Sequence, residues 1–167
     1  MPKEESIVDT KLKHRGVFDL ELLYNKLRNW LVNEDYSDPV TGGEKKYAEK
    51  IKPNGKQIEI VWESSKEREE GFFLIKIKTS FYVIGLNETE VERDGKTIKL
   101  DKAEVDMKFS SSVTINAKEK WDEFSLFYKI YKRYMIREKI EEIKIECYKD
   151  TNDLISEVKS FLSMYNA

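Results

Sequence analysis

Hydrophobic periodicity predicts a strand followed by a helix at the start of the chain. Over residues 7–15 the charged side chains fall on odd positions, which is the two-residue period of a strand with one buried face. From residue 20 the apolar spacing changes to threes and fours and holds to Asn33, which predicts a helix. Asp19 lies at the N-cap position, where a carboxylate accepts hydrogen bonds from the free amides of the first turn.

The middle of the chain alternates in steps of two and predicts antiparallel strands joined by short turns. Asn54-Gly55 supplies the positive φ angles that a tight hairpin needs between the first two of these strands. The expected strands are 44–52, 57–63, 72–84, the two sides of a hairpin around residues 94–95, and 102–115.

The hairpin around Asp94-Gly95 is the clearest turn in the sequence. A two-residue loop at this point pairs Val91 with Ile98 and Glu90 with Lys99. One pair is apolar and the other joins opposite charges, and both kinds of pair stabilise neighbouring strands. The turn type and the side chains therefore predict the same register.

Three segments are expected to interrupt the strands. The charged segment 64–70 predicts a loop, and the Gly-Leu-Asn segment 85–87 predicts the end of a strand. The three serines at 110–112 predict a bulge or bend.

Residues 121–165 predict one long amphipathic helix, because apolar residues recur there at intervals of three and four. The polar run 150–153 consists of weak helix formers, but Thr151 keeps the apolar phase. Two arrangements stay open: the helix passes through this run, or it folds back there as a second helix. Cys147 lies on the apolar phase, which favours a buried thiol over a nucleophile.

Together these elements predict an α+β fold in which residues 1–167 form a single domain. We expect a strongly curved antiparallel sheet of six to seven strands that grips the long C-terminal helix, with one helix between strands 1 and 2. This order of elements resembles the helix-grip fold of the START-related and polyketide-cyclase-like (SRPBCC) superfamily, which includes lipid-transfer proteins. The resemblance covers nearly the whole chain, and it implies that the helix covers the concave side of the sheet.

Composition excludes several classes of partner and site but does not identify the function. The 30 basic and 32 acidic residues give a net charge of −2, which exerts no general attraction for nucleic acid or membranes. One cysteine and one histidine cannot build a disulfide or a Cys/His metal site, so we expect no metal and no cofactor. No segment has the length and apolarity of a transmembrane helix, and no signal sequence is recognisable, so we expect a cytoplasmic protein.

Eight aromatic residues are candidates for a ligand cavity between the sheet and the long helix. Their rings supply apolar walls, and the tyrosine hydroxyls supply the few polar groups that such a cavity needs. The alternative is that the same rings fill an ordinary core. The candidates are Tyr47, Trp62, Phe73, Phe81, Phe109, Phe127, Tyr131 and Tyr134.

A short basic stretch, Lys129, Lys132, Arg133 and Arg137, is interleaved with tyrosines on the predicted helix. Such a surface can bind phosphates of nucleic acid or anionic lipid. The alternative is a solvated helix face, which is favoured because glutamates follow at once.

Three functional hypotheses follow. The leading one is a non-enzymatic binding module that carries a hydrophobic small molecule or docks a protein partner through its C-terminal helix. The second is a nucleic-acid- or ribosome-associated factor that uses the basic stretch. The third is a cyclase-like enzyme, for which the single histidine, His14, and buried tyrosines would be the candidates. No phosphate-binding loop or nucleophile motif supports an enzyme.

Overall fold

The computed structural model describes residues 3–115, 117, 130 and 137–165. Its elements, in chain order, are β1 (Lys3–Phe18), α1 (Leu20–Asn33), the short π-helical turn η1 (Pro39–Gly43), β2 (Glu44–Lys52), β3 (Gly55–Arg68), β4 (Phe73–Arg93), β5 (Lys96–Ile115) and α3 (Arg137–Ser163).

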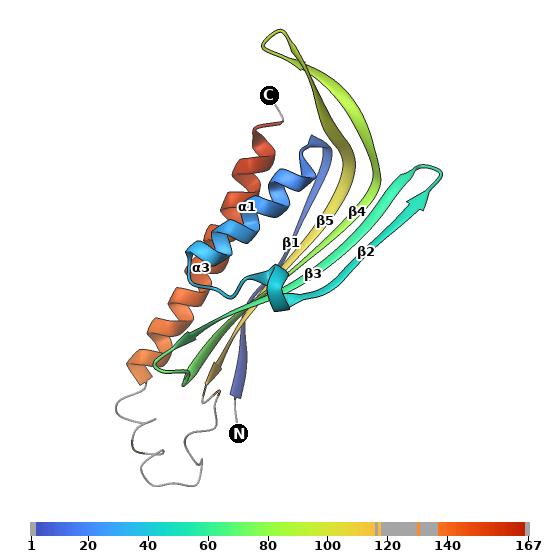
Figure 1. Cartoon of the computed structure of the whole chain (residues 1–167). Helices are drawn as coiled ribbons and strands as arrows, with labels where there is room; N and C mark the ends of the chain where they lie inside the picture. The colour runs from blue at the N-terminus through green and yellow to red at the C-terminus, as the bar shows by residue number, and fades with distance from the viewer. Residues whose placement is uncertain (1–2, 116, 118–129, 131–136, 166–167) are drawn as a thin grey trace.

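The five strands form one antiparallel sheet in the order β1-β5-β4-β3-β2, so β1 and β2 are its edges. Figure 1 shows long, bent strands with α1 and α3 on the inner side of the bend. The predicted α+β fold with an antiparallel sheet and a C-terminal helix is confirmed. The prediction of six to seven strands is wrong, because the described residues form five, and the sheet is not closed.

The expected strand end at residues 85–87 is a β-bulge. β4 continues for 21 residues, and its register against β5 shifts between Ile84 and Asn87. Gly85 has a φ of 66°, in the left-handed region that glycine tolerates best. One extra residue is therefore absorbed without ending the strand. Two predicted strands merge into β4, and the second side of the hairpin likewise merges with the last strand to form β5.

The charged segment 64–70 is a loop only at its end, because β3 continues to Arg68. Ser64 is buried on the inner face of the sheet, and the Lys66 side chain on the same face is paired with Asp150 of α3. Lys66 and Arg68, two of the charged residues that predicted a loop, thus form ion pairs with acidic residues of α3. The serines at 110–112 pair with β4 in regular register. The predicted irregularity occurs on their other side, where the register of β1 against β5 shifts between Ser6 and Val8, opposite Ser112 and Ser111.

The register predicted for the Asp94-Gly95 hairpin is confirmed, with Val91 opposite Ile98 and Glu90 opposite Lys99. At the end of this hairpin, Arg93 donates a hydrogen bond to the backbone carbonyl of Met164, 2.8 Å away. Its guanidinium also lies 5.3 Å from the ring centre of Tyr165. The hairpin is thereby attached to the end of α3.

The helix α3 passes straight through the polar run 150–153, so the continuous arrangement is the one observed. Thr151 is completely buried, and its hydroxyl donates to the carbonyl of Cys147 at 2.7 Å. Cys147 is also buried, as predicted, and burial raises the pKa of its thiol. Residues 121–129 and 131–136 of the predicted helix lie outside the described residues.

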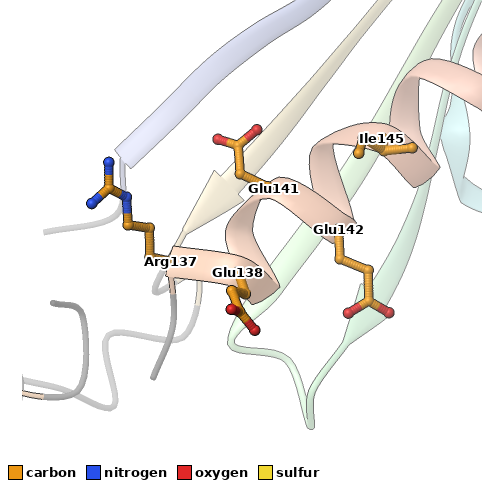
Figure 2. A pocket seen from close by; sticks show the side chains of 5 residues that line it. All are labelled: Arg137, Glu138, Glu141, Glu142 and Ile145. Carbon is orange, nitrogen blue, oxygen red and sulfur yellow. The ribbon is translucent and has the colours of Figure 1, made fainter. Parts of the chain in front are cut away.

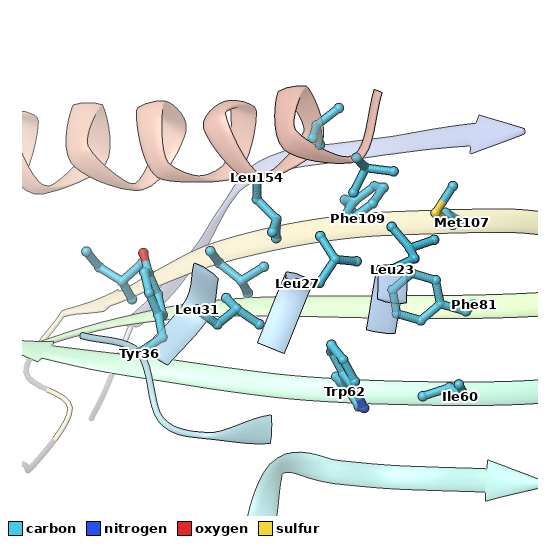
Figure 3. Close-up of a cluster of buried hydrophobic side chains, with 14 of the residues drawn as sticks. Leu23, Leu27, Leu31, Tyr36, Ile60, Trp62, Phe81, Met107, Phe109 and Leu154 are labelled. Carbon is cyan, nitrogen blue, oxygen red and sulfur yellow. The ribbon is translucent and has the colours of Figure 1, made fainter. Parts of the chain in front are cut away.

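The core lies between the inner face of the sheet and the two helices (Figure 3). α1 contributes Leu23, Leu27 and Leu31 at helical spacing, and α3 contributes Leu154. The strands contribute side chains from alternate positions. The largest fully buried residues are Trp62, Phe18, Phe73, Phe109, Phe161, Leu23, Leu27, Leu31, Ile75, Ile77 and Met107.

A polar cluster joins α3 to the sheet at the edge of this core. The Tyr36 hydroxyl donates to Asp150 Oδ2 at 2.8 Å, and Lys66 Nζ lies 2.9 Å from the same oxygen. Lys66 also lies 4.6 Å from the centre of the Tyr36 ring. Burial and the neighbouring Asp150 carboxylate raise the pKa of Tyr36, so its hydroxyl stays a donor. The buried Asp150 carboxylate is therefore bound from two sides, by the Tyr36 hydroxyl and by Lys66 Nζ.

Replacing Leu154 with alanine is expected to lower the free energy of unfolding by about 2–5 kcal/mol, because the side chain is completely buried between α3 and the sheet. Denaturant titration followed by circular dichroism measures this loss. Ile145→Ala is the matched control on the same helix, because Ile145 is 64% exposed. It should change the free energy by less than about 0.5 kcal/mol. Equal effects of the two changes would contradict the packing described above.

Candidate functional site

Four of the predicted cavity residues, Trp62, Phe73, Phe81 and Phe109, are at most 3% exposed and belong to the continuous core. Trp62 and Phe81 pack edge to face with ring centres 5.6 Å apart. Trp62, Phe81 and Phe109 lie among the leucines of α1 and Leu154 of α3 (Figure 3). Phe73 lies farther along β4 and packs edge to face on Phe72, with ring centres 5.0 Å apart. Phe127, Tyr131 and Tyr134 lie outside the described residues.

Tyr47, the fifth described candidate, lies elsewhere. It is 52% exposed on the edge strand β2, opposite Ile60 of β3. Its side chain has the inner orientation that the sequence predicted, but the helices do not cover this end of β2. Tyr47 instead forms one wall of a hollow that opens to solvent.

This hollow has a volume of about 490 Å³ and lies between the first turns of α1 and the inner side of the sheet. We call it the α1–β2 hollow. Helix α1 forms one wall, Tyr47 and Ile60 form the opposite wall, and Asp101 of β5 closes one end. The lining residues are Leu20, Glu21, Tyr24, Asn25, Tyr47, Ile60 and Asp101.

A hydrogen-bonded group centred on Glu44 fixes the position of Tyr24 in this wall. The Tyr24 hydroxyl donates to Glu44 Oε2 at 2.6 Å, and the indole nitrogen of Trp62 donates to the same oxygen at 2.9 Å. The rings of Tyr24 and Trp62 also pack edge to face, with centres 4.7 Å apart. Tyr24 is thus held by its hydrogen bond to Glu44 and by its ring contact with Trp62.

The phenols of the hollow are neutral at physiological pH. Burial and the hydrogen bond to Glu44 raise the pKa of Tyr24 to about 12. Burial, followed by the charges of Glu49 and Glu44, raises the pKa of Tyr47. Neutral phenols supply apolar ring faces together with one polar group each.

The N-terminus of α1 forms the acidic end of the hollow. Asp101 Oδ2 accepts a hydrogen bond from the amide of Leu20 at 3.0 Å, and Asp19 caps the helix by accepting from the amide of Leu22. Both carboxylates satisfy free amides of the first turn and offset the positive end of the helix dipole. Glu21 stands on the exposed rim beside them.

Sequence reasoning missed Tyr24, Glu44 and Asp101 as site residues. Tyr24 belongs to the apolar stripe of α1 and therefore was expected to be core. The alternation of β2 predicts Glu44 on the face opposite to Tyr47, and only the register shift between Glu44 and Lys46 places it opposite Trp62. Nothing local indicates that Tyr24 and Trp62 would both bind it. The contact between Asp101 and α1 spans 81 residues and follows only from the sheet order.

Of the predicted basic stretch, only Arg137 is described; Lys129, Lys132 and Arg133 lie outside the described residues. Arg137 lines an open hollow of about 610 Å³ at the start of α3, together with Glu138, Glu141, Glu142 and Ile145 (Figure 2). Three glutamates accompany one arginine there, which does not favour an anion-binding surface at this position.

Another open hollow, of about 470 Å³, lies between α1 and α3. Leu22 and Met164 in its lining are each about half exposed. In the described residues, no group of three or more His, Cys, Asp or Glu side chains is arranged to hold a metal ion. The described helices also include none that is long and apolar enough to span a membrane.

No protein-family model matches the chain, and no curated protein matches it. Among solved structures, a protein of unknown function from Staphylococcus aureus is similar over 95% of this chain and 98% of its own, with 11% identity and a TM-score of 0.21. A putative uncharacterized protein from Rhizobium leguminosarum is similar over 92% of this chain and 99% of its own, with 7% identity and a TM-score of 0.19. TM-scores this low carry no argument about fold or function.

His14, the candidate for the enzyme hypothesis, lies on the inner side of β1 and lines none of the hollows described above. Its ring packs edge to face on Phe18, with centres 5.4 Å apart. Its Nε2 is buried without a hydrogen-bond partner. Burial lowers the pKa of this histidine, because a positive charge is poorly solvated there.

This burial predicts a pH-dependent stability. Below the ordinary histidine pKa of about 6.5, the unfolded chain binds a proton that the folded chain does not yet bind. The free energy of unfolding should therefore be highest above that pH and fall as the pH drops toward the lower, folded-state pKa. His14 is the only histidine, so few other side chains titrate in this range.

The measurement is denaturant unfolding of the wild type and of His14→Gln at several pH values between about 5.5 and 7.5, a range set by the ordinary histidine pKa. The wild type should lose more stability than the variant as the pH falls. Parallel pH profiles for the two proteins would show that His14 titrates normally.

Proposed function

We propose that the protein is a non-enzymatic binding module and that the α1–β2 hollow holds a small, predominantly apolar ligand. The proposal rests on one comparison. The hollow is open and has aromatic and aliphatic walls, whereas core side chains occupy the space between α3 and the sheet. Its volume of about 490 Å³ is within the range typical of small-molecule sites.

The composition of the walls supports a ligand with an apolar body. Leu20 and the rings of Tyr24 and Tyr47 offer apolar surface, and buried Ile60 adds to the lining. The bonds from Tyr24 and Trp62 to Glu44 hold one of these walls in place before a ligand arrives. A site that is already ordered loses little entropy on binding.

The helix-grip fold remains part of this proposal. It is supported by the sheet order, in which the first and last strands are neighbours, and by the position of α3 on the inner side of the bent strands. The ligand site proposed here differs from the one that the sequence suggested. It lies at the open end of the sheet, beside α1, and not beneath the C-terminal helix.

Binding is favoured over catalysis by the chemistry of the same residues. The pKa of Tyr24, raised to about 12, lies far from physiological pH, which suits a hydrogen-bond donor better than a general acid or base. Docking of a protein partner through α3 and binding of nucleic acid through residues 129–137 stay predictions.

The proposal is tested by titrating the protein with a library of neutral, cationic and anionic aromatic fragments and recording amide proton–nitrogen correlation spectra. Binding fragments should shift the amides of residues 20–25, 47 and 60 together. Absence of such shifts at millimolar concentrations of every class of fragment would refute a small-molecule site at this hollow.

Tyr47→Ala should weaken the fragments that bind by about tenfold, since one apolar wall is lost. Tyr148→Ala is the matched control, because Tyr148 is 59% exposed on α3, comparable to the 52% of Tyr47. Both changes should leave the unfolding transition almost unchanged. Equal weakening by the two changes would contradict the location of the site.

A further inference from the structure

Three carboxylates at the α1–β2 hollow have no cationic partner. Glu21 and Asp101 line the hollow, and Glu44 lies next to it, bonded to Tyr24. In the part of the chain that the structure describes, no lysine or arginine lies within ion-pair distance of any of the three.

Two basic residues near the hollow are paired with other acids. Lys56, which faces Tyr47, lies 3.0 Å from Glu49. Arg28, one turn along α1 from Tyr24, makes two hydrogen bonds to Asp38 at 2.9 and 2.7 Å. Neither cation is free to neutralise the hollow.

Among the described residues, Glu44 accepts more hydrogen bonds than the other two carboxylates. Its Oε2 accepts both hydrogen bonds, from Tyr24 and from Trp62, while no bond to Oε1 occurs in the described residues. Both donors are neutral groups, so neither supplies a positive charge. A partly buried charge with neutral donors only is stabilised further by a nearby positive charge.

The aromatic walls favour the same kind of ligand. Tyr24 and Tyr47 line the hollow from opposite sides, and neutral phenol rings have a negative electrostatic potential over their faces. Neutral phenol rings and carboxylates together attract an organic cation and repel an anion.

We propose that the ligand of the α1–β2 hollow carries a positive charge: a protonated amine or quaternary ammonium group on a small apolar body. The inference rests on the proposed function and specifies its ligand class. The apolar body contacts Leu20 and Ile60, and the cationic group lies among Glu21, Asp101 and the tyrosine rings.

The positive end of the α1 dipole does not oppose this arrangement. Asp19 and Asp101 accept hydrogen bonds from the first amides of the helix and offset its partial charge. Asp101 uses one oxygen for this contact, and its second oxygen is available to the ligand.

The test uses three probes of nearly equal size: benzylamine, benzyl alcohol and benzoate, which at neutral pH are cationic, neutral and anionic. Affinities are obtained from the shifts of the amides of residues 20–25, 47 and 60 in the full-length protein at low ionic strength. Benzylamine should bind about tenfold more tightly than benzyl alcohol, and benzoate should bind most weakly. Added salt should reduce the advantage of benzylamine.

Two conservative variants localise the charge effect. Glu21→Gln removes one negative charge from the exposed rim, and Glu44→Gln keeps an oxygen that can accept from Tyr24 and Trp62. Each should reduce the advantage of benzylamine over benzyl alcohol several-fold, while benzyl alcohol binds as before. Glu141→Gln, on the exposed surface of α3, makes the same change in net charge and should leave the ratio unchanged.

The outcomes separate this inference from the function on which it rests. Equal binding of benzylamine and benzyl alcohol, or tighter binding of benzoate, overturns the charge preference and leaves a neutral-ligand site. A benzylamine preference that Glu141→Gln reduces as much as Glu21→Gln also overturns it, because the effect is then one of net charge. Absence of shifts at these amides with all three probes refutes both proposals.

Discussion

The contact between α3 and the inner face of the sheet is the interaction on which the rest of the structure depends. Strands as long as β4 and β5 present a broad apolar face that must be covered, and α3 together with α1 covers its central part. The polar cluster of Tyr36, Lys66 and Asp150 fixes the position of α3 along the sheet, because a displaced helix would leave Asp150 shielded from water without partners.

The α1–β2 hollow follows from the same arrangement. The strands extend beyond the helices at one end, so α1 leaves part of the inner face of β2 and β3 uncovered (Figure 1). Tyr47 is half exposed for this reason, although it shares its face with buried Ile60. The exposed aromatic surface is therefore a result of unequal element lengths, and the bonds from Tyr24 and Trp62 to Glu44 make it rigid.

Features that depend on neighbouring residues could be predicted from the sequence, and those that depend on distant partners could not. The helix after Asp19, the Asp94-Gly95 hairpin and its register are encoded within a few residues. The extension of β3 to Arg68 could not be predicted, because Lys66 and Arg68 point inward only when the acidic residues of α3 are there to meet them. Among the site residues, the inward position of Tyr47 on β2 could be predicted. The convergence of Tyr24, Glu44 and Asp101 could not, because it depends on the sheet order and on the placement of α1.

The bulge at Gly85 has a consequence for the hairpin beyond it. Before the bulge, odd-numbered residues of β4 such as Phe81 and Val83 face the helices, but the extra residue reverses this alternation. Val91, paired with Ile98, and Thr89, paired with Leu100, consequently lie on the outer side of the sheet. Leu100 is 8% exposed yet is not part of the core cluster. One inserted residue thus ends the alternation whose apolar side faces the helices and begins a different one in the hairpin, where Ile98 is 40% exposed.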